Sequence, residues 1–225
     1  MAVDPRKRQK KLERKKAKDK ARHKALAVRQ ATSATHRFER AAQGRVIDAF
    51  VAGHLRDEGL GQVMLARDLG ADRVGFACFL IDVYCLGVKD VFFDVVSKGE
   101  YVNSLRGKLA RKYEIEQETP EFIRKLVEDS VSFARSLGLE PHADYERARV
   151  IFGDIDASAC SEVFEFGRDG KPCFISGPND TPARCTRIIR TLTENCGEDN
   201  FDVVLQMTGS SLLSSGLSRV ELPEG

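Results

Sequence analysis

The chain has 225 residues, of which 42% are hydrophobic and 31% charged, as in ordinary globular proteins. Its longest apolar stretch, residues 74–86, contains Asp82 and is too short for a membrane helix. The charged N-terminus is not followed by the apolar region of a secretory signal, so we expect a soluble, cytoplasmic protein.

The net charge of +2 is the sum of two oppositely charged regions. Residues 1–45 hold 16 Lys and Arg against 4 Asp and Glu, a net charge of +12. Residues 46–225 hold 20 against 30, a net charge of −10. Such asymmetry is typical of an interaction arm attached to a separate folded body.

The most basic segment, residues 6–24, carries almost no apolar side chain and cannot form a core by itself. We therefore predict a helical or disordered arm over residues 1–35, which contacts the phosphates of a nucleic acid. No aromatic residue precedes Phe38, so the arm offers no base stacking. The alternatives are a solvated tail, a tail attracted to the protein's own acidic region, and an anionic membrane surface, which we disfavour because bulky apolar anchors are lacking. The predicted phosphate-binding cations are Arg6, Lys7, Arg8, Lys10, Lys11, Arg14, Lys15, Lys16, Lys18, Lys20, Arg22 and Lys24.

After the arm, apolar spacing predicts a helix over residues 36–56 that docks through Phe38, Ile47 and Phe50. Three strands follow, at residues 62–68, 74–86 and 88–96, and then a helix over residues 101–113. The clearest helix begins at residue 120, because Thr119 is a good N-cap, and Gly138 ends it.

The remaining elements are a short helix at residues 142–152, a hairpin of 162–166 with 172–175, a capped helix from about residue 181 to Gly197, and a strand at residues 201–207. The hairpin turn would be formed by Asp169 and Gly170. We predict an α+β fold, with an antiparallel or mixed sheet and packed helices, over residues 36–207. Residues 208–225 read as a flexible tail.

A second basic feature lies on the late helix, where Arg184, Arg187 and Arg190 recur every three residues. They could extend the phosphate contacts of the arm, although an ordinary solvated face is the favoured interpretation. The loop 176–182 before this helix could hold an anion on free amides. We favour a structured turn, because Asp180 would occupy those amides and no lysine stands at the Walker spacing.

An enzymatic alternative depends on carboxylates. Asp82, Asp94, Asp154 and Asp156, with Asp90 beside them, could converge as ligands for Mg²⁺ or Mn²⁺ in a metal-dependent phosphodiesterase or nuclease. Asp82 is the most interesting of these, because a carboxylate within an apolar strand needs a partner.

The six cysteines form no Cys-x-x-Cys pair and read as buried thiols in a reduced compartment. Cys85, close to a strand end, is a weaker candidate nucleophile, with His54 or His142 as its base.

The runs FLIDVYCLGVKDVFF (residues 79–93) and GKPCFISGPND (residues 170–180) resemble segments of uncharacterised bacterial proteins that also begin with a Lys-rich arm. The resemblance would cover most of the chain and implies a bacterial, cytoplasmic setting. Because it carries no assigned activity, it transfers no catalytic or binding residue.

These observations predict a nucleic-acid-binding accessory protein, a non-enzyme rather than an enzyme, that contacts RNA, a ribosome or DNA through its arm without sequence specificity. A protein partner could bind the acidic region. We expect no membrane association and no cofactor, with Mg²⁺ or Mn²⁺ required only by the phosphodiesterase alternative.

Overall fold

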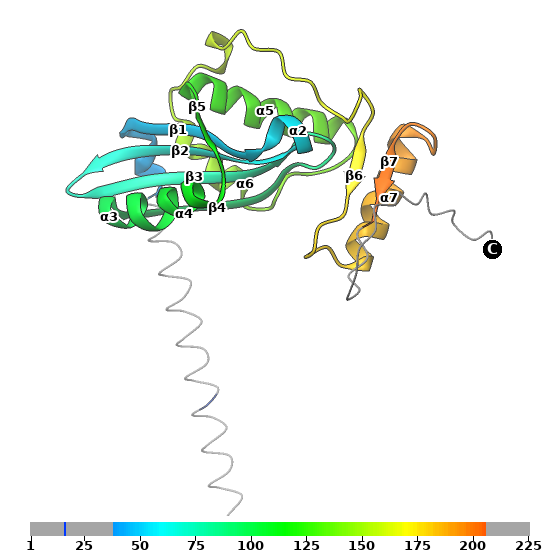
Figure 1. Ribbon diagram of the computed structural model, residues 1–225, viewed down its shortest axis with the longest axis horizontal. Helices are drawn as coiled ribbons and strands as arrows, with labels where there is room; N and C mark the ends of the chain where they lie inside the picture. The colour runs from blue at the N-terminus through cyan, green and yellow to red at the C-terminus, as the bar shows by residue number, and fades with distance from the viewer. Residues whose placement is uncertain (1–15, 17–37, 206–225) are drawn as a thin grey trace, which may run out of the picture.

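The computed structural model describes Lys16 and residues 38–205, and we call residues 38–205 the folded body. Its centre is a five-stranded antiparallel sheet in the order β4-β3-β2-β1-β5, covered by helices on both faces (Figure 1). The predicted α+β class is confirmed. The strands are β1 (Arg45–His54), β2 (Leu60–Gly70), β3 (Arg73–Asp82), β4 (Gly87–Ser97) and β5 (Ile115–Gln117).

The predicted helix over residues 36–56 is wrong. Only a short 3-10 turn, η1 (Arg40–Gln43), precedes β1, and one helical turn, α2 (Leu55–Glu58), follows it. Phe50 packs on one face of the sheet and Val51 on the other. Both are buried because helices cover both faces. Such two-sided burial gives a strand a continuous apolar run, which in the sequence resembles the apolar face of a helix. Ile47 is 36% exposed and docks poorly.

One face of the sheet packs against α5 (Pro120–Ser136). Thr119 caps this helix by accepting a bond from the Phe122 amide, as predicted. The same layer contains α6 (Tyr145–Ala148), η3 (Arg149–Phe152) and η4 (Ala157–Ala159). Phe152 stacks on Phe79 of β3, with 5.5 Å between ring centroids. This layer, together with η1, encloses the largest apolar core of the folded body.

A buried arginine joins this layer to the sheet. Arg67 of β2 is 4% exposed and donates to three backbone carbonyls: Ile151 at 2.8 Å, Phe152 at 2.6 Å and Gly44 at 2.8 Å. Its only acidic neighbour within 4 Å, among the residues that the structure describes, is the exposed Asp154 at 3.7 Å. Burial lowers the pKa of Arg67, an effect that Asp154 partly opposes. The Arg67 side chain therefore joins β2 to Ile151, which lies 84 positions further along the chain.

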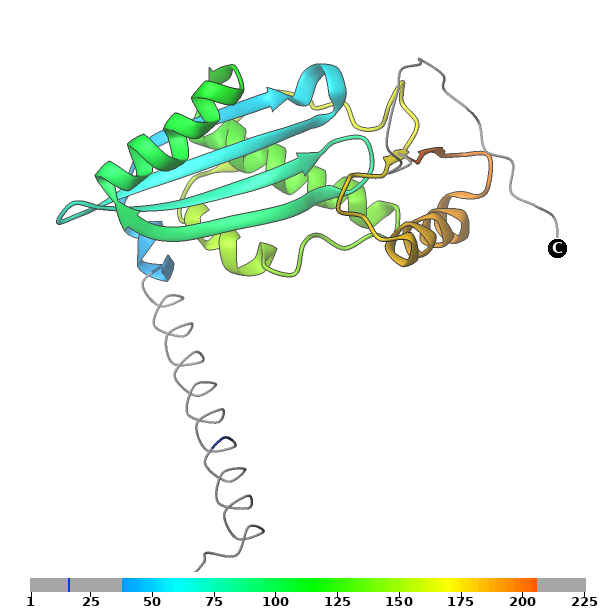
Figure 2. The ribbon, with the colours of Figure 1, turned by 60° about the horizontal axis from the view of Figure 1, so that its bottom comes forward.

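The opposite face carries one continuous helical segment, residues 98–112, which we call the cover helix (Figure 2). It comprises α3 (Lys98–Glu100), the π-helix η2 (Tyr101–Arg106) and α4 (Gly107–Lys112). Tyr101, Leu105 and Leu109 pack against Phe50 and Phe76 of the sheet. The helix predicted at residues 101–113 is thereby confirmed, with an earlier start.

A smaller unit packs at one end of the sheet (Figure 1). It contains β6 (Cys173–Ile175), α7 (Pro182–Cys196) and β7 (Asp202–Val204). The predicted turn is present, with positive φ at Asp169 (54°) and Gly170 (77°). The predicted hairpin is wrong, because residues 162–166 form no strand and β6 pairs in parallel with β7 instead.

The outer edge of β4 is occupied by side chains of its own strand. The Val91 amide donates to Asp90 Oδ1 at 2.8 Å, and the Val95 amide donates to Asp94 Oδ1 at 2.7 Å. These carboxylates therefore bind amides that an additional strand would need.

Two carbonyls of β4 are also occupied. The Val88 carbonyl accepts from the His142 amide at 2.9 Å, and the Val95 carbonyl accepts from Arg73 Nη2 at 3.0 Å. The other edge strand of the sheet, β5, is only three residues long.

Candidate nucleic-acid interface

The basic arm joins the folded body at a well-packed position. Phe38 is 2% exposed, and its ring centroid lies 4.7 Å from that of Phe93 on β4. Ala41 in the following turn is fully buried. Among the arm cations predicted to bind phosphate, only Lys16 is described, and its side chain is exposed. The other eleven lie outside the described residues.

The predicted arginine stripe lies on the exposed side of α7, opposite the buried Ile188 and Leu192. Arg184 Nε already lies 3.1 Å from Asp180 Oδ1, and Arg190 Nε lies 3.8 Å from Glu194 Oε1. Only Arg187 has no acidic group within 4 Å among the described residues. The stripe therefore offers an anion one uncommitted cation rather than three.

The loop before α7 is a structured turn. Thr181, rather than Asp180, caps the helix by accepting from the Arg184 amide. Asp180 accepts from the Gly177 amide at 2.7 Å and lies 3.4 Å from Lys89 Nζ on β4. Burial alone would raise the pKa of Asp180, but the Gly177 bond and the two nearby cations lower it overall. This carboxylate thereby attaches α7 to the sheet.

The cover helix is the basic element of the folded body. It holds five Lys and Arg against one acid, Glu100, whereas residues 38–205 as a whole hold 21 against 29. Its attachment to the sheet is polar. Asp48 Oδ2 on β1 accepts from Tyr101 Oη at 2.9 Å and from Arg106 Nε at 2.7 Å. Burial, followed by the Asp48 charge, raises the pKa of Tyr101, so its hydroxyl stays a donor at neutral pH.

The π-helical turn explains how both side chains reach one carboxylate. In an α-helix, residues five apart point about 140° away from each other, because each residue turns about 100°. The wider π turn brings positions i and i+5, here Tyr101 and Arg106, closer to one face. Such segments are rare and are frequently found at functional sites.

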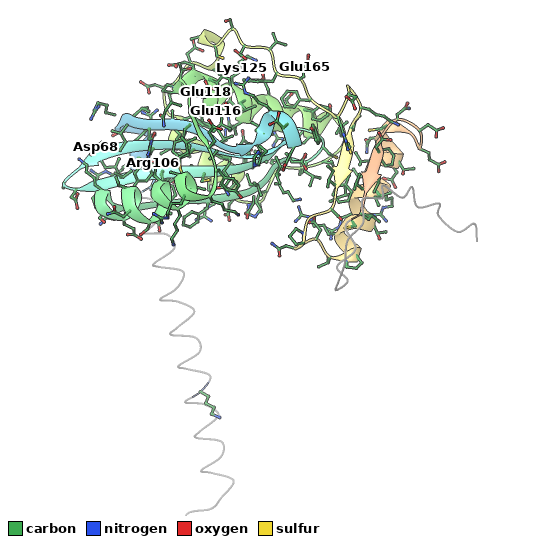
Figure 3. The ribbon with its side chains drawn as sticks, in the orientation of Figure 1. Asp68, Arg106, Glu116, Glu118, Lys125 and Glu165 are labelled. Atoms are coloured by element: carbon green, nitrogen blue, oxygen red, sulfur yellow. The ribbon has the colours of Figure 1, made fainter. Side chains whose placement is uncertain are left out.

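Acidic side chains gather on β5. Glu116 and Glu118 lie two residues apart, and Arg56 bridges them at 3.3 Å and 3.6 Å (Figure 3). Burial raises the pKa of Glu118, an effect that Arg56 opposes and Glu116 supports.

The structure does not bring the four candidate metal ligands together. Asp82 ends β3 opposite Leu60, whereas Asp154 contacts Arg67, seven residues further along β2. That separation along the strand is about 23 Å. Asp94 lies opposite Phe76, on the sheet face of the cover helix, whereas the neighbours of Asp154 pack on the other face.

Each of these carboxylates has its own local partner. Asp82 Oδ1 accepts from the Tyr84 and Cys85 amides, both at 3.0 Å, and burial raises its pKa to about 6. Asp156 caps η4 by accepting from the Ser158 amide at 2.9 Å. Within the described part of the chain, no three His, Cys, Asp or Glu side chains are grouped to hold a metal ion.

The candidate thiol is poorly placed for reaction. Cys85 is fully buried, and this burial raises its pKa well above the usual range, so the thiol stays protonated at neutral pH. His54 faces the Tyr113 ring, and His142 Nε2 lies 3.7 Å from Asp90 Oδ1. All six cysteines are free thiols.

Comparisons with known proteins found no match to the chain. No family model matches it, and neither a curated protein nor a solved structure is significantly similar to it. The resemblance to bacterial proteins with a Lys-rich arm stays a prediction. Across the residues that the structure describes, no helix combines the length and apolarity needed to cross a bilayer.

Sequence reasoning missed two kinds of residue. Arg67 and Asp48 form hydrogen bonds with residues far away in the chain, and no local sequence pattern indicates such bonds. The cations of α4 could have been found, because residues 98–112 are basic within an otherwise acidic region.

Proposed function

We propose that this protein is a nucleic-acid-binding accessory protein that binds the phosphate backbone without recognising the base sequence. The observation that carries the proposal is the segregation of charge, with +12 in residues 1–45 and −10 in residues 46–225. Each neutralised phosphate releases condensed counterions, so a dense array of Lys and Arg binds a polyanion strongly. RNA, free or within a ribosome, is the partner class we favour.

Two further features support this proposal. Phe38 and Ala41 are buried, so the arm would start from a fixed point on the folded body rather than from a loose linker. The net charge of residues 38–205 is −8, which would repel phosphates from most of the surface and orient the bound nucleic acid toward basic parts.

A salt titration tests the proposal. If the arm neutralises about six phosphates of a duplex, log K falls with log salt at a slope near −5. Deleting residues 1–30, which lie before the folded body, should remove most of that slope. Absence of binding to RNA and DNA at low salt, or binding that survives the deletion unchanged, would contradict the proposal.

A rival role for the arm is neutralisation of the protein's own acidic surface. In that case the arm stabilises the folded body at low salt, and its deletion lowers the melting temperature there. Under the proposed function, deleting the arm leaves the melting temperature unchanged. The deletion variant then purifies without bound nucleic acid, whereas the full chain retains it. Purifying the full chain from a cell extract with and without nuclease treatment makes the same test on natural partners. Partners that are lost after nuclease treatment are bound through nucleic acid.

A further inference from the structure

We propose that the outer face of α4, formed by Lys108, Arg111 and Lys112, is a second contact for the phosphodiester backbone. We call these three residues the α4 face. The inference rests on the proposed function, and it adds a contact surface on the folded body itself. The contact would position the nucleic acid, while the arm supplies most of the affinity.

The α4 face is conspicuous because most other cations of the folded body are paired. Of the 21 Lys and Arg in residues 38–205, 13 lie within 4 Å of an acidic oxygen. Lys108, Arg111 and Lys112 are all exposed and are among the remaining eight. Lys112 Nζ instead lies over the Tyr113 ring, 4.8 Å from its centroid.

The spacing of the three cations places them together. Positions i, i+3 and i+4 of an α-helix lie on one face, with about 5–6 Å between Cβ atoms. Like charges at these spacings repel one another and destabilise a helix. The helix dipole favours cations in the last turn of the cover helix, which accounts for Arg111 and Lys112, while Lys108 lies just before that turn. An external anion would relieve the repulsion among all three.

The cover helix is attached to the sheet at both ends, which holds the α4 face in place. Asp48 fixes η2 to β1 through Tyr101 and Arg106, immediately before α4. At its other end, Lys98 Nζ bonds Asp68 Oδ2 at 2.9 Å, on β2. The chain enters the folded body at Phe38, which packs on the opposite face of the sheet. A polyanion bound by both the arm and the α4 face would therefore pass around the edge of the sheet.

The chemistry of the α4 face indicates backbone contact. Its three side chains are cations with several donors each, and the residue between the first two on the exposed surface is Ala110. No aromatic ring among them could stack on a base, and phosphates are the matching partner for exposed Lys and Arg. The shared ligand chemistry is a phosphodiester backbone, from RNA or from DNA.

The test uses the full chain with Lys108, Arg111 and Lys112 each changed to Gln, which keeps helix propensity. A 20-base-pair RNA duplex is titrated at several salt concentrations, and the same duplex as DNA is titrated in parallel. Losing three phosphate contacts should make the slope of log K against log salt less steep by about 2.7. Between 50 and 200 mM salt, wild type should thus lose about 40-fold more affinity than the variant.

A control variant changes the exposed Arg56, Arg135 and Arg168 to Gln and has the same net charge. These residues lie outside the basic region 1–45, on α2, on α5 and in the loop before β6, so they form no common face. The proposal expects a slope within about one unit of wild type for this control. Equal losses in the two variants, or an unchanged slope in the α4 variant, would overturn it.

The two proposals fail in different ways. If wild type binds neither duplex at low salt, the proposed function itself is wrong. If wild type binds with a steep slope that the α4 variant keeps, the function stands and the α4 face is not part of the interface. A change of slope with the RNA duplex alone would identify RNA as the source of the backbone, and with the DNA duplex alone would identify DNA.

Discussion

Replacing the buried Arg67 with methionine tests how the helical layer is held on the sheet. Methionine keeps most of the length of the side chain and fills the same space with apolar atoms. It removes the donors that reach the carbonyls of Ile151, Phe152 and Gly44. The carbonyls of Ile151 and Phe152, two buried residues, would then lose a charged donor.

The expected loss can be worked from these contacts. A hydrogen bond to a charged group contributes about 1.5–3 kcal/mol, and an unsatisfied buried acceptor costs about 1–3 kcal/mol. The guanidinium no longer has to be desolvated in the variant, which offsets several kcal/mol of the gross loss. We expect Arg67→Met to lower the free energy of unfolding by about 3–5 kcal/mol.

Urea unfolding, followed by circular dichroism, measures this loss. Arg73→Met is the matched control, because Arg73 is exposed and donates to a single carbonyl, that of Val95. It should cost less than about 1 kcal/mol. Asp154→Ala should cost less than about 0.5 kcal/mol, because Asp154 is 96% exposed. A loss below 1 kcal/mol for Arg67→Met, or one equal to that of Arg73→Met, would refute the reasoning.

Three further predictions concern single side chains. Since burial raises the pKa of Asp82 to about 6, above its unfolded value, its favourable contribution is complete below about pH 4 and is lost as pH rises through 6, by up to about 3 kcal/mol. Asp82→Asn should remove this part of the pH dependence of unfolding, and an unchanged difference between pH 4.5 and pH 8 would contradict the assignment. Asp48→Ala leaves the Tyr101 hydroxyl without its acceptor and should cost about 2–3 kcal/mol, with faster amide exchange across residues 98–112 as the specific readout. Thr119→Ala removes the cap of α5 and should cost about 1 kcal/mol in thermal unfolding, whereas Thr119→Ser should cost little.

Elements governed by local rules could be predicted from the sequence. The α5 helix has a cap, an N-terminal proline and one apolar face, and each of these signals lies within the helix itself. The turn at Asp169 and Gly170 is equally local, because both residues accept positive φ. Its flanking segments were mispredicted because the partner of β6 is β7, about thirty residues further along the chain.

The first strand could not be recognised for a different reason. Strand β1 is an interior strand, with β2 and β5 on either side and helices on both faces. Its buried run Ala49, Phe50, Val51 and Ala52 therefore lacks the alternation that marks a half-exposed strand. The choice between helix and strand for this segment depends on the cover helix, which buries its second face and lies about fifty residues further along the chain.

The candidate sites also divide into features that local sequence predicts and features that depend on contacts distant in the chain. The arginines of α7 lie on an exposed face, as the sequence predicts, but the acidic neighbours Asp180 and Glu194 pair with two of them. Residue type alone suggests the carboxylates as metal ligands, and the strand register separates Asp82 from Asp154. Spacing in the sequence says little about convergence when the residues lie on different strands.

The carboxylates of β4 have a consequence for how the protein behaves at high concentration. A long edge strand with Phe92 56% exposed is the type of surface on which sheets of separate molecules join and grow into aggregates. Asp90 and Asp94 bind two amides of that edge and add negative charge on both sides of Phe92. The residues first considered as metal ligands thus act as gatekeepers, which keep the sheet of one molecule from extending into the next.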